Sequence, residues 1–322
     1  MRRPTRRSAI GAVLAAVGLS AVGLVAVPGV SQAARSHKPP PLFYLSLGDS
    51  YSVGYQTPNL TNGPGYTDKV AKKDHMTLEN FGCGGATTAS LVSTIGCNGS
   101  QEAGHAVTYP STTQEGAALA FIASHPGQIG LITVSIGGND VTACANAASP
   151  ISCVLTASGT IKTNVDQLVS DLTAALAAGH DSAKLVGLTY PDVILGDDVY
   201  PAGSTNPTLA ALSVTAFDSL INPTLSAAYT SVPYGSFVNV TSASYVKGSV
   251  SAPKGDDTGT WNSSTGAYTG PTIKFKPFGT AVPTSVAEVC KLTYYCSITG
   301  DIHPNTKGYA FITSLILADL GL

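Results

Sequence analysis

The fold is decided by the stretch Leu42-Phe43-Tyr44-Leu45-Ser46-Leu47-Gly48-Asp49-Ser50-Tyr51-Ser52. An apolar run of strand length ends here in Gly-Asp-Ser, and these three residue types are common in tight turns. The pattern predicts a buried strand whose carboxyl end carries a serine on a sharp turn. Such a turn raises the hydroxyl above the edge of a sheet, where a general base can reach it.

Four more apolar segments follow, separated by stretches long enough to form helices. The predicted strands are Phe43–Leu47, Thr77–Phe81, Gly130–Ile136, Lys184–Leu188 and Ser236–Val240. Helical spacing or alanine content predicts helices at Thr113–Ser124, Ile161–Ala178, Leu209–Tyr229 (interrupted at Pro223) and Pro304–Leu320. This alternation predicts a parallel sheet covered by helices on both faces. In such sheets ligands bind at the carboxyl ends of strands, and Ser50, Gly85 and Asn139 each follow a predicted strand.

The composition excludes several classes of protein. Apolar residues make up 43% of the 322 residues and charged residues only 11%, which predicts a well-buried core. The formal net charge is −2 and there is no basic patch, so a nucleic acid is not an expected partner. The chain also lacks a glycine-rich phosphate loop with its lysine, and we expect no nucleotide, metal or other cofactor.

The N-terminus has the pattern of an export signal. Four arginines precede an apolar stretch over residues 9–27, and Ser31-Gln32-Ala33 forms a small-x-small cleavage site. We therefore expect residues 1–33 to be a signal peptide cleaved after Ala33, residues 34–41 a linker and residues 42–322 a single secreted domain. Arg6-Arg7 leaves the twin-arginine route open beside the general secretory route, and a retained membrane anchor is the alternative to cleavage.

Six cysteines remain in the expected mature chain and fall into three near-neighbour pairs. Although fifteen pairings are formally possible, this spacing predicts Cys83–Cys97, Cys144–Cys153 and Cys290–Cys296. Each bond would close a short loop beside one of the glycine- or histidine-containing segments discussed below. A zinc site is the rival interpretation, but the chain has no C-x-x-C pair.

Residues 246–289 interrupt the alternation of strands and helices. They are rich in Gly, Ser, Thr and Pro and contain the only tryptophan, Trp261. Long loops in compact domains are often functional, so this segment is expected either to form a rim at the mouth of the site or to be a surface excursion with a small hairpin.

Three later segments complete a pattern begun by Gly48-Asp49-Ser50. They are Gly82-Cys83-Gly84-Gly85-Ala86-Thr87, Gly137-Gly138-Asn139-Asp140 and Asp301-Ile302-His303-Pro304. In this order the four segments resemble the four blocks of the SGNH (GDSL) hydrolase family, and the resemblance runs from about Phe43 to the C-terminus. It implies a flavodoxin-like three-layer α/β/α sandwich with a five-stranded parallel sheet. It also implies an esterase or lipase of the secreted actinobacterial type.

The resemblance assigns Ser50 as the nucleophile and His303 as the base. Its oxyanion donors would be the backbone N–H groups of Ser50 and Gly85 and the side-chain amide of Asn139. The family usually places an aspartate three residues before the histidine, but this chain has Gly300 there and Asp301 one residue later. Either Asp301 or a backbone carbonyl near Gly300 would therefore orient His303. A capping role for His303 ahead of a helix starting at Pro304 is the structural alternative.

Three functions fit this machinery. The first is a monomeric lipase or esterase acting on small-molecule or lipid esters, with an acyl pocket lined by Tyr51, Tyr55, Phe81 and Tyr190. The second is a polysaccharide deacetylase of the acetylxylan type, with Trp261, Tyr268, Tyr294 and Tyr295 as aromatic platforms for sugar; a phospholipase is a variant of the same chemistry. The third is a secreted binding protein that has lost activity. Asp49 and Asp140 are expected to be structural.

Overall fold

A five-stranded parallel sheet forms the centre of the computed structural model, which describes residues 42–56, 61–245, 259–298 and 300–322. The strands are β1 (Phe43–Gly48), β4 (Thr77–Asn80), β5 (Ile129–Ser135), β6 (Lys184–Leu188) and β7 (Gly235–Val238). Their order in the sheet is β4-β1-β5-β6-β7. This is the doubly wound order of flavodoxin-like folds, as the sequence predicts. The expected signal peptide and linker lie outside the described residues.

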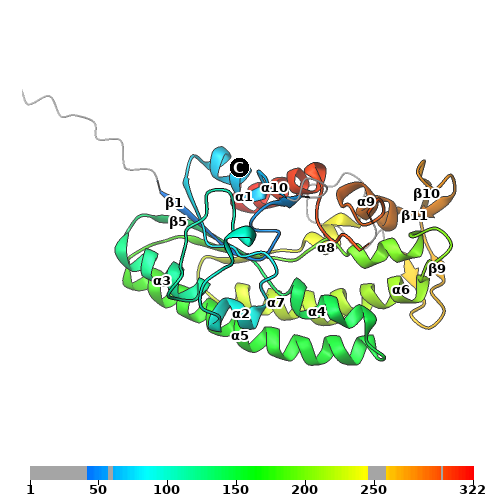
Figure 1. Cartoon of the computed structure of the whole chain (residues 1–322), viewed down its shortest axis with the longest axis horizontal. Coiled ribbons are helices and arrows are strands. Elements are labelled where there is room, and N and C mark those ends of the chain that lie inside the picture. The colour runs from blue at the N-terminus through cyan, green and yellow to red at the C-terminus, as the bar shows by residue number, and fades with distance from the viewer. Residues whose placement is uncertain (1–41, 57–60, 246–258, 299) are drawn as a thin grey trace, which may run out of the picture. The chain divides into compact units, whose positions relative to one another are not determined.

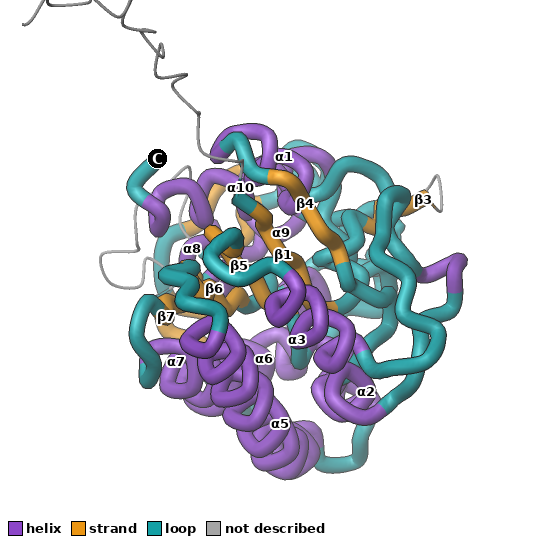
Figure 2. Tube along the Cα trace, turned by 90° about the vertical axis from the view of Figure 1, so that its left-hand side faces the viewer, coloured by secondary structure: helices purple, strands orange, loops and turns teal. Residues whose placement is uncertain are grey.

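Helices cover both faces of the sheet, which makes a three-layer sandwich (Figure 1). One layer contains α2 (Thr88–Ser93), α3 (Gln114–Ser124), α5 (Pro150–Ala178) and α7 (Asn222–Thr230). The other contains α1 (Tyr66–Asp74), α8 (Val240–Ser244) and α10 (Thr306–Leu320). Figure 2 shows the strands between these two layers, with α5 on one side and α1 and α10 on the other.

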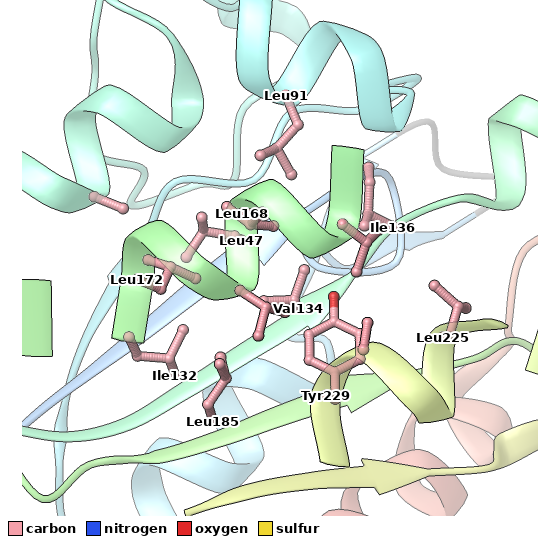
Figure 3. Close-up of a cluster of buried hydrophobic side chains, with 14 of the residues drawn as sticks. Leu47, Leu91, Ile132, Val134, Ile136, Leu168, Leu172, Leu185, Leu225 and Tyr229 are labelled. Carbon is pink, nitrogen blue, oxygen red and sulfur yellow. The ribbon is translucent and has the colours of Figure 1, made fainter. Parts of the chain in front are cut away.

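Alternation along the strands explains why both faces are apolar. Leu45 and Leu47 of β1 face the α5 layer, where they join Ile132 and Val134 in a buried cluster (Figure 3). Tyr44 faces the opposite side and packs in the cluster formed with α1 and α10. Because successive side chains of a strand point to opposite faces, a strand buried on both sides is continuously apolar.

The long helix α5 begins eleven residues before the predicted start at Ile161. Pro150 occupies its first turn, where a missing N–H costs nothing. In the added turns, Val154 and Ser158 are buried and continue the helix face that Ile161 begins in the predicted part. A small serine stands where the pattern would need an apolar residue, which is why the spacing did not reveal this part of the helix.

The predicted helix Leu209–Tyr229 is interrupted near Pro223, as expected, by a turn of π-helix. Helix α6 (Pro207–Ala216) passes into a π-helical turn, Phe217–Ile221 (η4), and then into α7. Pro223 lacks a backbone N–H and lies in the first turn of α7. The π-helical turn comes directly before this first turn. The three pieces together cover the predicted helix Leu209–Tyr229.

The described part of residues 246–289 forms small hairpins and the start of a helix. Strands β8 (Thr260–Trp261) and β9 (Tyr268–Thr269) pair, as do β10 (Thr272–Lys274) and β11 (Ala281–Pro283). Helix α9 (Thr284–Leu292) follows at once. A third short pair, β2 (Tyr55–Gln56) with β3 (Thr61–Asn62), lies after the first strand. The chain between Tyr245 and Gly259 lies outside the described residues.

Within the ranges that the structure describes, no helix combines the length and the apolar character that a bilayer crossing requires.

Candidate active site

The nucleophile turn is built on a glycine that no other residue can replace. Gly48 ends β1 with a φ of 136°, and a Cβ there would lie 2.1 Å from the carbonyl oxygen of Ser135. The side chain of Gln114 binds both sides of this glycine: its Oε1 accepts from the Gly48 N–H at 2.6 Å, and its Nε2 donates to the Gly48 carbonyl at 3.1 Å. The turn is thereby fixed two residues before Ser50.

Ser50, His303 and Asp301 form a hydrogen-bonded chain. The Ser50 Oγ lies 3.0 Å from His303 Nε2, and His303 Nδ1 lies 2.9 Å from Asp301 Oδ1. The same carboxylate oxygen accepts the backbone N–H of His303 at 2.9 Å. Asp301 therefore reaches the ring although it is only two residues away, because the backbone N–H bond folds the side chain back over the loop. The geometry is that of a nucleophile, a base and a group that orients the base.

His303 is not a helix cap. Asn305 is the N-cap of α10, and its Oδ1 accepts from the N–H groups of Lys307 and Gly308. Pro304 forms a bridge with Thr293 instead of opening the helix, so the capping alternative is wrong.

Aromatic residues surround His303 and partly remove it from water. Tyr55 lies with its ring centroid 4.4 Å from the imidazole, and the Tyr51 hydroxyl donates to the carbonyl of Ile302 at 2.5 Å. Burial lowers the pKa of His303 below its usual value, while the Asp301 carboxylate opposes this shift. A neutral imidazole at neutral pH can accept a proton from Ser50.

The three expected oxyanion donors come from three segments, the turn at Ser50, the Gly82–Thr87 loop and the Gly137–Asp140 loop, and the last two are joined to each other. Asn139 lies in α4 (Gly138–Thr142), and its Nδ2 donates to the Ala86 carbonyl at 2.9 Å. Asp140 binds Thr88 twice, through the backbone N–H at 2.9 Å and the hydroxyl at 2.6 Å. Asp140 thus fastens the Gly137–Asp140 loop to the Gly82–Thr87 loop, the structural role expected for it.

Two backbone N–H groups in this region are available to a ligand. Within the described ranges, neither the Ser50 N–H nor the Gly85 N–H donates a hydrogen bond to the protein. Gly85 has a φ of 79°, a left-handed conformation that favours glycine. Unengaged N–H groups beside a nucleophile suit an oxyanion that forms only during the reaction.

Asp49, the residue before Ser50, is buried. One oxygen accepts the Tyr51 N–H at 3.0 Å, and the other accepts the Tyr190 hydroxyl at 2.7 Å, with Asn139 Nδ2 at 3.5 Å. Desolvation raises the pKa of Asp49 to about 7. The residue holds the turn together, which is the structural role predicted for it.

An apolar cavity of about 90 Å³ opens beside Ser50 and Asn139. Its walls come from the segments that follow β5 and β6, from α5 and α6, and from the π-helical turn. Besides Ser50 and Asn139, the lining includes Ile151, Val154, Tyr190, Leu212, Phe217 and Ile221. Such a surface favours a hydrocarbon chain over a sugar.

Three of the four aromatic residues expected in the acyl pocket lie at the site, and one does not. Tyr51 and Tyr190 line the apolar cavity, whereas the Tyr55 ring lies against His303 at an interplanar angle of 52°. Phe81 does not reach the site, because it lies in the main core against Phe121. Thr77–Asn80 ends before Phe81, and the chain then turns this side chain inward.

Of the residues expected as sugar platforms, Trp261 and Tyr268 lie together, with ring centroids 4.9 Å apart, whereas Tyr295 is not available as a platform. Trp261 packs against the small core formed by α9 and its neighbours, and Tyr295 is buried with its hydroxyl donating to Asp197 at 2.7 Å. No described residue of 246–289 lines the apolar cavity, so the described part of this segment is not a rim of that cavity.

All six cysteines are paired as the spacing predicts. The structure contains the disulfides Cys83–Cys97, Cys144–Cys153 and Cys290–Cys296. No cysteine is free, which removes the zinc interpretation. Cys144 also lines the apolar cavity. Its disulfide bond to Cys153 connects the segment after Asn139 to the first turn of α5.

Sequence reasoning missed Gln114, which contributes most to fixing the turn. A glutamine in the first turn of an alanine-rich helix has no distinguishing pattern, and its partner lies 66 residues away. The role of Tyr190 as the partner of Asp49 was missed for the same reason. Asn164, which donates to Thr88 at 3.0 Å from α5, is a third such residue.

The sequence of residues 46–216 matches the GDSL-like lipase/acylhydrolase family. A curated relative, Lipase 2 of Streptomyces coelicolor, is 30% identical over 162 residues, which are 46% of this chain and 48% of that protein. The chain thus spans about half the length of this relative.

Solved structures of two lipases are also similar. An extracellular lipase of Streptomyces rimosus is 18% identical and covers 62% of this chain and 80% of its own, with a TM-score of 0.41. The lipase Lip_vut3 from a goat rumen metagenome is 16% identical and covers 86% and 96%, with a TM-score of 0.48. These two likenesses are too weak to carry an argument. The family match, which includes three of the four sequence blocks, is sufficient by itself: the chain belongs to the GDSL-like lipase/acylhydrolase family.

Proposed function

We propose that this protein is an exported hydrolase that cleaves carboxylic esters with apolar acyl chains through an acyl-enzyme on Ser50. The observation that carries the proposal is the chain of hydrogen bonds from Ser50 through His303 to Asp301, at 3.0 and 2.9 Å, at the mouth of an apolar cavity. Membership of the GDSL-like lipase/acylhydrolase family supports it.

The first half of the reaction forms the acyl-enzyme. His303 Nε2 takes the proton of Ser50 as its Oγ bonds to the ester carbonyl carbon, and Asp301 stabilises the imidazolium that results. Negative charge then develops on the carbonyl oxygen. The N–H groups of Ser50 and Gly85 and the amide of Asn139 would receive it. Collapse of the intermediate breaks the bond to the alcohol oxygen, which takes the proton from His303.

The second half repeats these steps with water. His303 removes a proton from the water as its oxygen attacks the acyl carbon, and the bond to Ser50 Oγ breaks. His303 returns the proton to Ser50, and the carboxylic acid leaves. Every proton is carried by one ring nitrogen, so the mechanism needs no further acid or base.

The cavity favours an acyl chain longer than acetate. Ile151, Leu212 and Phe217 offer hydrocarbon surface on the acyl side, where an acetyl group would leave most of it empty. This observation favours a lipase or esterase over a polysaccharide deacetylase.

The test uses nitrophenyl butanoate and nitrophenyl octanoate with the oxidised protein and with Ser50→Ala. We expect wild type to cleave both and Ser50→Ala to lose activity by at least about 10³-fold. A fluorophosphonate probe should label Ser50, as mapped by mass spectrometry. Equal rates for the two proteins would refute the proposal.

The substrate preference is tested by Leu212→Trp, which narrows the cavity. We expect the ratio of kcat/KM for octanoate to that for butanoate to fall roughly tenfold, because a wider side chain excludes the longer chain first. An unchanged ratio would show that the acyl chain does not occupy this cavity.

A further inference from the structure

The loop that carries the base, residues 301–303, is hydrogen-bonded to the nucleophile turn at two points. His303 Nε2 lies 3.0 Å from Ser50 Oγ, and the Tyr51 hydroxyl donates to the Ile302 carbonyl at 2.5 Å. Among the described residues, no other hydrogen bond joins this loop to the nucleophile turn. Both bonds come from adjacent residues of the turn, one from the nucleophile and one from the residue after it.

The Tyr51 side chain is held firmly in this position. It is 3% exposed, and its ring packs edge-on against Tyr190 with the ring centroids 4.8 Å apart. Its backbone N–H donates to Asp49 Oδ1 at 3.0 Å. Burial, together with the nearby Asp49 and Asp301 carboxylates, raises the pKa of Tyr51 above its usual value, so the hydroxyl keeps its proton and stays a donor.

The hydrogen bond from Tyr51 fixes the peptide group that precedes the base. The carbonyl of this peptide belongs to Ile302 and accepts from Tyr51, whereas its N–H belongs to His303 and donates to Asp301 Oδ1 at 2.9 Å. Both polar edges of the peptide are thereby engaged, which fixes the backbone from which the imidazole projects. Tyr51 thus acts on His303 through the backbone, without touching the reacting nitrogen.

The two hydrogen bonds between the loop and the turn differ in what happens to them during the reaction. In the free enzyme, Ser50 Oγ donates its proton to His303 Nε2. In the acyl-enzyme, Oγ carries the acyl group and has no proton to donate, and Nε2 must accept a proton from water instead. The bond between Tyr51 and Ile302 involves no reacting atom, so it is the one that remains at this stage.

We propose that Tyr51 is a positioning residue that holds His303 in line with the acyl carbon while water attacks the acyl-enzyme. The inference rests on the proposed function. In this step His303 Nε2 takes a proton from water as the water oxygen bonds to the acyl carbon; the bond to Ser50 Oγ breaks, and Oγ recovers the proton. In acylation the hydrogen bond between Ser50 and His303 supplies the same alignment, so Tyr51 matters most for deacylation.

The experiment separates acylation from deacylation in single-turnover measurements. The oxidised protein, in excess, is mixed rapidly with nitrophenyl butanoate. Released nitrophenol and the butanoyl-Ser50 found by intact-mass spectrometry of quenched samples are followed over time, and the two time courses together give both rate constants. Tyr51→Phe removes the hydroxyl and keeps the ring. Tyr44→Phe is the matched control, because it removes a buried hydroxyl that bonds Thr133 Oγ1 at 2.7 Å and does not line the apolar cavity.

We expect Tyr51→Phe to slow deacylation about tenfold, the factor expected for loss of roughly one hydrogen bond, and to slow acylation less than about threefold. Butanoyl-Ser50 should therefore accumulate to a higher level in this variant than in wild type. Tyr44→Phe should leave the ratio of the two rate constants unchanged. A loss of overall stability alone would not shift this ratio, so the measurement separates positioning from a purely structural role.

The possible failures are distinct. Absence of nitrophenol release by wild type would overturn the proposed function itself. With normal release by wild type, deacylation that is as fast in Tyr51→Phe as in wild type would overturn the role of Tyr51 alone. An equal fractional loss in both steps would also overturn it, because Tyr51 would then support the turn as a whole. The same accumulation of butanoyl-Ser50 in Tyr44→Phe would count against it as well, since any buried hydroxyl would then have the effect.

Discussion

Replacing Gln114 by leucine tests how the nucleophile turn is held. The side chain is 2% exposed and makes two hydrogen bonds to Gly48, at 2.6 and 3.1 Å. Leucine is similar in size, so the change removes the polar contacts without leaving a large cavity.

The expected loss of stability can be worked out group by group. The Gly48 carbonyl keeps one partner, because the Cys83 N–H donates to it at 3.0 Å. The Gly48 N–H is left buried without an acceptor, which costs about 1–3 kcal/mol. With the lost bond to the carbonyl, the free energy of unfolding should fall by about 2–4 kcal/mol, and Tm by roughly 3–7 °C.

Activity should fall by a separate route. A turn no longer fixed at Gly48 displaces the Ser50 Oγ and its N–H relative to His303, and small displacements of reacting atoms are costly. We expect kcat to fall by about 10- to 100-fold with little change in KM, since the acyl cavity is untouched. Urea unfolding measures the loss of stability, and steady-state hydrolysis of nitrophenyl butanoate measures the loss of activity. Gln167→Leu, the same change at an exposed position of α5, is the control.

The reasoning would be refuted by a Gln114→Leu protein as stable and as active as wild type. It would also fail if KM rose while kcat stayed constant, because the defect would then lie in substrate binding.

Three further predictions concern the titrating groups. Asp301→Asn should lower kcat/KM by about 10²–10⁴-fold, and a loss below about tenfold would favour a backbone carbonyl as the partner of His303. Because burial holds the pKa of His303 below 6.5 and the reaction needs the neutral ring, kcat/KM should rise with pH through a midpoint below that value; a midpoint above it in a pH–rate profile would contradict this. Burial raises the pKa values of Asp49, Glu115 and Asp192 to about 7, so the folded state binds more protons than the unfolded chain from about pH 4 to 7. The free energy of unfolding should therefore fall as pH rises through this window, and Asp192→Asn should flatten the fall by about 1–3 kcal/mol in urea titrations at several pH values.

The strands were predictable because their burial on both faces makes them continuously apolar. Each predicted strand coincides with an observed one to within two residues, as Lys184–Leu188 and β6 show. Ser50, Asp301 and His303, which the structure brings within hydrogen-bond distance of one another, could be singled out because they lie in short contiguous motifs. The roles of Gln114 and Tyr190 could not be predicted from the sequence, because each depends on a partner far away in the chain.

Several helices were missed for a different physical reason. Helix α1 is short and carries Asp68, Lys69, Lys72 and Lys73 among few apolar residues, so its periodicity is weak. Helix α9 follows a stretch rich in glycine and proline and was read as part of the same loop. Its burial comes from packing against distant segments, which local composition does not report.

The π-helical turn Phe217–Ile221 has a consequence for the shape of the apolar cavity. A π turn holds one residue more than the α-helical turn it replaces. Its first and last residues, Phe217 and Ile221, both line the apolar cavity. Deleting a single residue there would return the turn to regular α-helical geometry and narrow it, because the extra residue is held within the turn itself. A one-residue change in this turn would therefore be expected to move Phe217 or Ile221 and reshape the apolar cavity while leaving the five-stranded sheet unchanged.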